Sequence, residues 1–342
     1  MRALIIGGTG FIGPEVVRLL AGRGHAVTLF HRGRTHADLP PGVNHISGDR
    51  RDLAEFRGEF KRLAPEVVLD LICYTEQEAQ AAVQTFGGVA ARMVTASSMD
   101  VYRGYGRLLR IEAGPPDPIP FTEDSPLRQA MYPHRAIAKA SEDFARSYEK
   151  IFVERAVMSD PRLRGTILRL PAIYGPGDPH HRTFEYLKRM DDGRPAILIE
   201  ETRARWRWTR GYVENVAGAI AIAVADDRAA GRIYNVGEQD APTEAEWIEG
   251  IGGAARWDGA IVAAPKELLP GHLVAPYDWQ HHIVGDTARI RNELGYAESV
   301  TREDALKKTV EWQRAHPPEK ADPAPFDYAA EDAALAKIEQ ES

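Results

Sequence analysis

Residues 7–13 read GGTGFIG and directly follow the apolar run 3–6. A short aliphatic run in front of glycines is typical of a buried parallel strand, and the glycines permit a tight turn with close backbone approach. Residues 14–21 then have helical spacing, with Pro14 suited to the first turn. A helix that opens directly after a strand points its free N–H groups and positive dipole end at a bound anion. Strand, glycines and helix in this order predict a site for the pyrophosphate of a dinucleotide.

Bulk composition bounds the class of protein. The 342 residues are 44% hydrophobic and 27% charged, which is ordinary for a globular protein of one large or two medium domains. The net charge of −7 argues against nucleic acid as a partner. One cysteine, Cys73, excludes an internal disulfide and fits a reducing compartment. Because the first strand begins at once and no apolar run is long enough to span a bilayer, we expect a cytoplasmic protein with no membrane partner.

Strand-like and helix-like segments alternate along the first half of the chain. We expect strands at 26–30, 43–47, 66–74, 92–97 and 166–172, and helices over 53–63, 76–86 and 137–159. This alternation predicts right-handed crossovers and a parallel sheet covered on both faces. We therefore expect an α/β fold with a doubly wound parallel (Rossmann) sheet in residues 1–178, which bind a dinucleotide, with later strands contributed from about 205–240. Residues 179–342 should form mainly a smaller substrate-binding lobe and a C-terminal tail that wraps or frays at the surface.

Five collinear strings resemble the extended branch of the short-chain dehydrogenase/reductase superfamily, the group of NAD(P)-dependent nucleotide-sugar epimerases and dehydratases. They are the GxxGxxG spacing in 7–13, GDRRD at 48–52, VTASSMDVY at 94–102, RLPAIYGPGD at 169–178 and RGYVENVAGAI at 210–220. The resemblance implies that Asp49 contacts the adenine and that Tyr74 lies near the nicotinamide ribose. From the residues alone, Asp49 could instead cap a helix and Tyr74 could be a packing residue. The cofactor-binding residues that we expect are Gly7, Thr9, Gly10, Phe11, Ile12, Gly13, His31, Arg32, Arg34, Asp49 and Tyr74.

The end of the second expected strand bears on the choice between NAD and NADP. A carboxylate there would bind the ribose 2′-hydroxyl of NAD, whereas cationic side chains favour the 2′-phosphate of NADP. His31 occupies this position, and Arg32 and Arg34 follow it. Guanidinium groups suit bidentate contact with a phosphate. We therefore expect NADP rather than NAD, with two solvated loop arginines as the alternative.

In the resembled family a serine orients the reacting group, a tyrosine exchanges a proton, and a lysine four residues later lowers the pKa of the tyrosine. Ser98 matches the serine, but the tyrosine–lysine pair is absent in its usual form. Two registers stay open for the lysine. Lys139 has Arg135 at the tyrosine position, and Lys150, which we prefer, has Arg146 there.

Other tyrosines lie close to both candidate lysines. Tyr148 precedes Lys150 by two residues, about 200° around a regular helix, so the two would diverge unless the helix bulges or begins between them. Tyr132 could enter from a loop in the Lys139 register. Glu154 adds a Lys-x-x-x-Glu pattern that resembles atypical members of the family. We expect Ser98, Tyr148 and Lys150 to be the catalytic residues.

Residues 205–210 read RWRWTR, and alternating arginine and tryptophan in a strand would place the two residue types on opposite faces. The resemblance implies that Arg205 and Arg210 grip the substrate. Two core tryptophans with solvated arginines opposite them are the alternative. Adjacent His180 and His181 would point apart, so we expect no metal.

Two functions follow from these patterns. The first is an NADP-dependent oxidoreductase or epimerase-like enzyme whose small substrate carries a hydroxyl or carbonyl, a nucleotide sugar being one candidate. The second is a non-catalytic NAD(P)-binding protein with a regulatory or RNA-binding role, because plastid stem-loop RNA-binding relatives in this family also lack the tyrosine. By analogy with the family, the helix over 137–159 could build a homodimer face.

Overall fold

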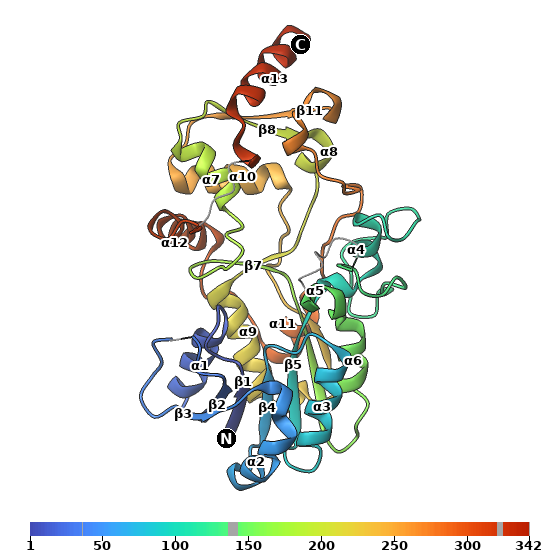
Figure 1. Ribbon diagram of the computed structural model, residues 1–342, viewed down its shortest axis with the longest axis vertical. Helices are drawn as coiled ribbons and strands as arrows, with labels where there is room; N and C mark the ends of the chain where they lie inside the picture. Colours follow the sequence, from blue (N-terminus) through green and yellow to red (C-terminus); the bar gives the residue numbers. More distant parts are fainter. Residues whose placement is uncertain (36, 136–142, 320–323, 342) are drawn as a thin grey trace.

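The computed structural model of the protein describes residues 1–35, 37–135, 143–319 and 324–341. Its centre is a parallel sheet with strand order β10-β6-β5-β4-β1-β2-β3 (Figure 1). The strands are β1 (Arg2–Ile6), β2 (Ala26–His31), β3 (Asn44–Ser47), β4 (Val67–Asp70), β5 (Arg92–Ser98), β6 (Arg164–Leu170) and β10 (Ile233–Asn235). Strand order reverses between β1 and β4, and ligands of such sheets bind at the carboxyl ends of the strands beside this switch point.

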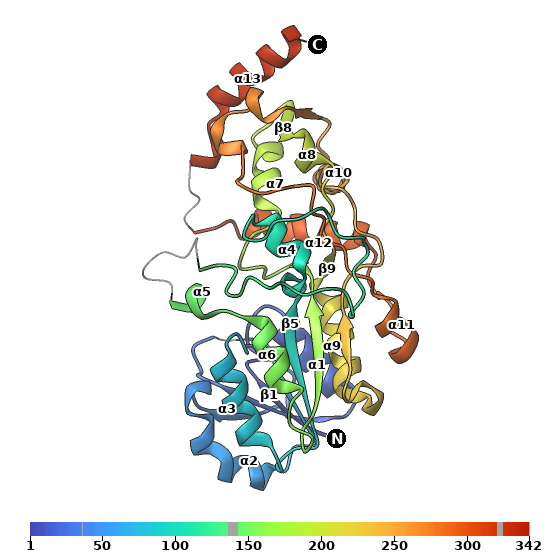
Figure 2. The ribbon, with the colours of Figure 1, turned by 90° about the vertical axis from the view of Figure 1, so that its right-hand side faces the viewer.

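Helices cover both faces of the sheet, which confirms the doubly wound class. On β1, Ala3 and Ile5 pack into one apolar cluster, whereas Leu4 and Ile6 pack into the other. Successive side chains of a strand point to opposite faces, so a strand buried on both sides must be apolar throughout. Helices α1 (Gly13–Gly22) and α9 (Val213–Ala225) pack together on one face, and α3 (Glu76–Phe86) and α6 (Lys150–Val157) on the other (Figure 2).

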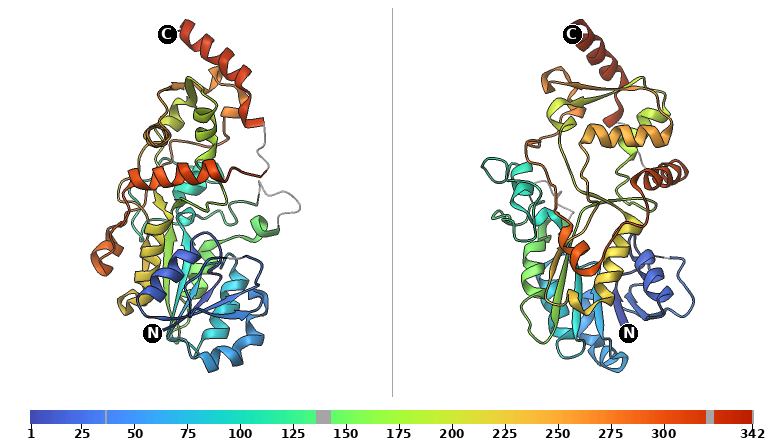
Figure 3. Two further views of the ribbon diagram at one scale, coloured as in Figure 1. Left: turned by 90° about the vertical axis from the view of Figure 1, so that its left-hand side faces the viewer. Right: turned by 180° about the vertical axis from the view of Figure 1, so that it is seen from behind.

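A second group of elements stands beyond the carboxyl ends of the strands. Here β8 (Ala196–Glu200) pairs in parallel with β11 (Ala260–Ala264), beside α7 (Phe184–Asp191), α8 (Glu201–Ala204) and α10 (Glu244–Ala255) (Figure 3). Helix α12 (Arg302–Ala315) packs on α10. Between this group and the sheet, β7 (Ala172–Tyr174) pairs with β9 (Arg210–Tyr212), and α4 (Arg103–Leu108) lies beside them.

The stretch expected as one helix over 137–159 differs from that expectation. From residue 143 onward it holds two helices, α5 (Asp143–Ser147) and α6, with Tyr148 and Glu149 between them. The Glu149 carboxylate caps α6 by accepting from the Ile151 N–H at 3.0 Å, and it also pairs with buried Arg128 at 3.0 Å. Because Arg128 lies 21 residues upstream, the local helical pattern carries no sign of this break. The single long helix on which we expected a dimer face is therefore not present over 143–159.

Three other expected segments also change. The strand over 66–74 stops at Asp70, whose carboxylate accepts from the Ile72 N–H at 3.1 Å and so turns the chain out of the strand. The helix over 53–63 is a 3-10 stretch (Arg50–Phe56) followed by α2 (Arg57–Leu63). The expected loose tail carries a helix, α13 (Tyr328–Glu341), held where Glu331 pairs with buried Arg189 at 2.7 Å.

Each helix in the described part of the chain is too short or too polar to cross a bilayer.

Candidate functional site

A cleft of about 970 Å³ opens at the carboxyl ends of the strands beside the switch point, and we call it the switch-point cleft. Every residue expected to bind the cofactor lines it. These are Gly7, Thr9, Gly10, Phe11, Ile12, Gly13, His31, Arg32, Arg34, Asp49 and Tyr74. Motifs from four separate stretches of the chain thus meet on one concave surface.

The glycine turn leaves room for a phosphate group above α1. Gly7 adopts φ +94°, and a Cβ on Gly13 would lie 2.4 Å from the Gly8 Cα, so both positions require glycine. By contrast, no atom lies within 4 Å of a Cβ placed on Gly10. The N-cap residue of α1, Ile12, makes no side-chain hydrogen bond to the first turn, and both Ile12 and Gly13 line the cleft. The chemistry of this turn fits a pyrophosphate.

The end of β2 presents cations and a neutral imidazole to the cleft. The His31 Nδ1 accepts from the Gly33 N–H at 3.1 Å, so its Nε2 carries the proton and donates to the His45 Nδ1 at 2.8 Å. Burial, and then the nearby His45, lower the pKa of His31, which keeps the ring uncharged. Arg32 and Arg34 are exposed and line the cleft. Within the described ranges, neither guanidinium has a hydrogen bond or an ion pair.

Asp49 serves as a cap and as part of the cleft wall at once. Its carboxylate accepts from the Arg51 N–H at 3.0 Å and from the Arg51 Nη2 at 2.7 Å. These hydrogen bonds hold the pKa of Asp49 well below its ordinary value. Sequence reasoning missed the residue beside it, Arg50, which also lines the cleft and forms a bidentate pair with buried Asp70 at 3.0 and 3.1 Å.

Ser98, Tyr148 and Asp100 form a hydrogen-bonded chain at the end of β5. The Tyr148 hydroxyl donates to the Asp100 Oδ2 at 2.6 Å and is also hydrogen-bonded to the Ser98 side chain. The Ser98 Oγ in turn accepts from the Asp100 N–H at 3.2 Å. Burial, and then the charge of Asp100, raise the pKa of Tyr148 well above its ordinary value. Sequence reasoning missed Asp100, although the carboxyl inside SSMDVY was a readable sign of it.

Lys150 lies in the same group of residues because α6 begins there. Its Nζ donates to the Cys73 carbonyl at 2.6 Å and to the Ala96 carbonyl at 2.8 Å. It also stands 4.6 Å from the ring centroid of Tyr74 and 5.8 Å from that of Tyr148. Burial lowers the pKa of Lys150. The structure thus brings Tyr148 and Lys150 together at the break between the two helices.

The competing register depends on Lys139, which lies outside the described residues. Its possible tyrosine, Tyr132, has its ring 5.9 Å from the Phe152 ring and 3.8 Å from the Arg135 guanidinium. Glu154 forms a bidentate pair with buried Arg169 at 3.0 and 2.8 Å. This pair ties α6 to β6.

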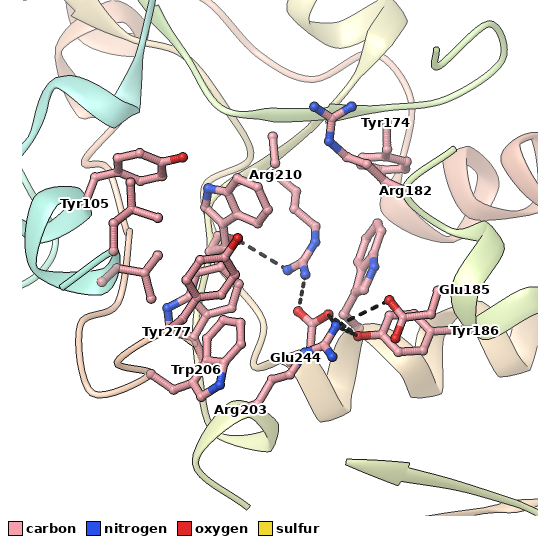
Figure 4. Close-up of a pocket in the computed structure, with 16 residues that line it drawn as sticks. Tyr105, Tyr174, Arg182, Glu185, Tyr186, Arg203, Trp206, Arg210, Glu244 and Tyr277 are labelled. Carbon is pink, nitrogen blue, oxygen red and sulfur yellow. Dashed lines mark hydrogen bonds and ion pairs between the residues drawn. The ribbon is translucent and has the colours of Figure 1, made fainter. Parts of the chain in front are cut away.

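A second cavity, of about 270 Å³, lies between α4, β7, β9 and α10, and we call it the aromatic pocket (Figure 4). Its aromatic lining residues are Tyr105, Tyr174, Tyr186, Trp206, Trp208, Trp247, Tyr277 and Trp279, and its charged ones are Arg182, Glu185, Arg203, Arg210 and Glu244.

The Arg/Trp stretch supplies one of its two expected substrate residues to this pocket. Arg210 lines the pocket, whereas Arg205 is exposed and lines neither the pocket nor the cleft. The chain is extended after α8, so successive side chains point to opposite sides. Arg210 therefore lies on the same side as Trp206 and Trp208, and Arg205 does not. Arg203, on α8, lines the pocket as well.

The cleft and the pocket adjoin at β7. Ala172 and Tyr174 face the aromatic pocket, while Ile173 between them faces the switch-point cleft. Arg182 lines both cavities. A ligand in the pocket would therefore lie next to one that fills the cleft.

A parallel doubly wound sheet with a glycine turn, a nucleotide-sized cleft and an adjoining pocket defines the class of dinucleotide-binding proteins with a second ligand site. Residues 3–237 match the NAD dependent epimerase/dehydratase family, and the chain belongs to this family. The family that the five collinear strings indicated is thus confirmed.

Two relatives that carry enzyme names match this chain over most of its length. The chain is 28% identical over 243 residues to a 2′-dehydrokanamycin reductase of Streptomyces kanamyceticus, a match that covers 69% of this chain and 61% of the reductase. It is 26% identical over 337 residues to a dTDP-glucose 4,6-dehydratase of Streptomyces niveus, covering 92% and 93% of the two chains. The solved dTDP-glucose 4,6-dehydratase DesIV of Streptomyces venezuelae, with NAD and TYD bound, superposes with a TM-score of 0.66 at 21% identity over 92% of this chain and 98% of its own. This last likeness shows the fold.

Proposed function

We propose that the protein is an NADP-dependent oxidoreductase or epimerase-type enzyme whose substrate is a sugar-like molecule with a hydroxyl or carbonyl group. The observation that carries the proposal is Arg182, which borders both the switch-point cleft and the aromatic pocket. Cofactor and substrate would then meet at β7. In this arrangement residues 1–178 hold the cofactor, and residues 179–342 supply most of the substrate site.

The preference for NADP over NAD rests on charge. Arg32 and Arg34 line the cleft with unpaired guanidinium groups in the described part of the chain, and His31 is neutral where NAD would need a carboxylate. A 2′-phosphate would supply the missing anion, and charge-assisted hydrogen bonds to it are about twice as strong as neutral ones.

The residues of the switch-point cleft would hold NADP, which would supply hydride-transfer chemistry at the substrate carbon. In the oxidation direction, the substrate hydroxyl gives its proton to the Ser98 Oγ. The Ser98 proton passes to the Tyr148 Oη, and the Tyr148 proton passes to the Asp100 carboxylate at 2.6 Å. Reduction runs the same transfers backward. Tyr148 acts here as a relay between two oxygens, which suits a phenol whose pKa is raised.

Lys150 helps to position the residues of the relay, Ser98, Tyr148 and Asp100. Its two backbone hydrogen bonds join the Cys73 loop to β5, and its charge lies under the Tyr74 ring that lines the cleft.

The test measures binding and turnover separately. Fluorescence titration with NADPH and NADH should show tighter binding of NADPH, and NADPH should be oxidised in the presence of a keto sugar. Equal affinity for the two cofactors would contradict the choice of NADP. Binding without hydride transfer to any of a panel of keto sugars and sugar nucleotides would instead favour the non-catalytic alternative.

A further inference from the structure

We propose that the aromatic pocket takes an uncharged, hydroxyl-bearing ring, a sugar or cyclitol without a diphosphate, and that it rejects nucleoside diphosphate groups. This rests on the proposed function and specifies its substrate class. Three observations carry it: the pairing of the pocket's charges, the kind of polar groups left without partners, and the volume of the pocket.

The first observation is that carboxylates already neutralise the arginines of the pocket. Arg210 pairs with Glu244 in a short contact between two buried side chains (Figure 4). The Arg203 Nη2 lies 3.6 Å from the Glu185 carboxylate and 3.9 Å from that of Glu244. A phosphate could bind these guanidinium groups only by displacing Glu244, which would leave a buried carboxylate without its partners.

Arg182, at the border with the cleft, is also paired with a carboxylate. Its Nη1 donates to the Asp178 carboxylate at 2.7 Å and to the Ile173 carbonyl at 2.9 Å. The three arginines of the pocket therefore face three carboxylates, those of Glu244, Glu185 and Asp178. A site with balanced charge favours a ligand without net charge. A diphosphate would lose its hydration on entering the pocket and would find no unpaired cation to compensate for that loss.

The second observation concerns neutral polar groups. In the ranges that the structure describes, the hydroxyls of Tyr105 and Tyr277 and the indole N–H groups of Trp208 and Trp247 make no hydrogen bond, and all four side chains line the pocket. A hydroxyl both donates and accepts, and an indole N–H donates. Together they match the alternating hydroxyl groups of a sugar ring.

Stacking surface and size agree with this choice. The Trp206 ring lies 5.3 Å from that of Trp208 and 5.0 Å from that of Trp279, which provides apolar faces for the C–H side of a ring. The volume of about 270 Å³ falls just below the range of roughly 300–1,000 Å³ usual for ligand pockets. It suits one compact ring rather than a nucleotide joined to a sugar.

The experiment uses the full chain loaded with NADPH and follows tryptophan fluorescence. The probes are myo-inositol, methyl glucoside, UDP-glucose and UDP. We expect the neutral rings to quench the fluorescence saturably, and UDP-glucose to bind no tighter than methyl glucoside. Tighter binding of UDP-glucose, with UDP competing against it, would overturn the inference. Since NADPH binding is measured in the same samples, failure here is distinguishable from failure of the proposed function.

Charge variants give an independent readout. Glu185→Gln releases Arg203 from its more exposed carboxylate partner and should tighten UDP-glucose binding by about tenfold, with little effect on methyl glucoside. Glu244→Gln should tighten UDP-glucose binding more strongly. Because Glu244 is buried, this variant could fail to fold, and Glu185→Gln then still provides the test. The matched control is Glu303→Gln, at an exposed carboxylate of α12 that pairs with Lys307. Equal effects of Glu185→Gln and the control, or none from either glutamate of the pocket, would refute the role of the paired charges.

Discussion

Tyr148 and Lys150 reach one site although a single residue separates them, because α5 ends at Ser147 and the intervening Glu149 caps α6. The usual spacing of four residues brings both side chains to one face of a continuous helix. Here the break replaces that spacing. The phenol then donates to Asp100, a carboxylate two residues beyond Ser98.

Removing the acceptor of the relay tests this arrangement. Asp100→Asn should lower kcat by about 10² to 10⁴, the usual share of general acid–base catalysis, because the Tyr148 proton loses its acceptor. NADPH affinity should stay unchanged. Steady-state kinetics measures both, with Asp124→Asn, at an exposed carboxylate paired with Arg289, as the control. An unchanged kcat would rule out Asp100 as the acceptor of the Tyr148 proton.

The pH dependence of kcat adds a second readout at Tyr148. Burial and the charge of Asp100 raise the pKa of this phenol, so it stays protonated through the neutral range. We expect kcat to show no ionisation of a tyrosine there. If a basic limb is present in the wild-type enzyme at neutral pH and disappears in Tyr148→Phe, the phenol titrates and the relay is wrong.

The proposed preference for NADP rests on the two arginines after β2. Replacing Arg32 and Arg34 together by alanine should raise the Kd of NADPH by at least about tenfold and leave that of NADH nearly unchanged, because only NADPH carries the 2′-phosphate. Fluorescence titration checks both cofactors. Arg51→Ala is the control, since Arg51 lines the same cleft but its charge is already paired with Asp49. A parallel loss of NADH affinity would contradict the assignment.

Sequence reasoning could place residues on the cleft wall where a motif fixes the backbone shape, and it missed contacts between residues distant in sequence. The turn from Gly7 to Gly13 lines the cleft, and Gly7 and Gly13 have local steric reasons to be glycine. Asp100 lies inside the motif at 94–102, but its partner Tyr148 lies 48 positions away. No local pattern joins the two.

At the scale of single elements, the break before α6 depends on a buried pair. Glu149→Gln removes the charge that satisfies Arg128, and breaking such a pair costs about 3–5 kcal/mol of unfolding free energy. Urea denaturation measures this loss. We expect a double variant, Arg128→Met with Glu149→Gln, to lose less than Glu149→Gln alone, since no buried charge is left unpaired. A loss below about 1 kcal/mol in Glu149→Gln would show that the pair does not hold the break.

The turn before α1 offers a matched pair of variants. Gly13→Ala places a methyl group 2.4 Å from the Gly8 Cα, so it should distort the turn and abolish NADPH binding. Gly10→Ala meets nothing within 4 Å in the protein and should leave the folded structure intact. Thermal unfolding and NADPH titration of the two variants check this. Equal stability and equal affinity would contradict the steric account.

Periodicity predicted elements whose pattern is local and failed at their ends. The helix expected over 76–86 is confirmed as α3 (Glu76–Phe86), whose start is fixed by a local capping box of Thr75 and Glu78. The strand over 66–74 was predicted too long, since the Asp70 carboxylate that turns the chain belongs to the same apolar run. The side to which Arg205 points depends on where α8 ends, which the sequence pattern did not show.

On the scale of the whole molecule, the parallel sheet and the group around β8 and β11 meet along β7 (Figure 1). The alternation of strands and helices predicted the sheet. The aromatic pocket could not be predicted, because its walls come from α4, β9, α10 and the loop near Tyr277, which are distant in sequence. This joint between cofactor cleft and pocket is what the proposed reaction requires.

A single-turnover experiment tests the central claim most directly. NADPH-loaded wild-type protein and Tyr148→Phe are mixed with a keto sugar, and the loss of NADPH fluorescence is followed. We predict hydride transfer in the wild type, a rate at least about 10² lower in the variant, and an unchanged Kd of NADPH. Hydride transfer at equal rates in both proteins, or bound NADPH that is never oxidised, would contradict the account.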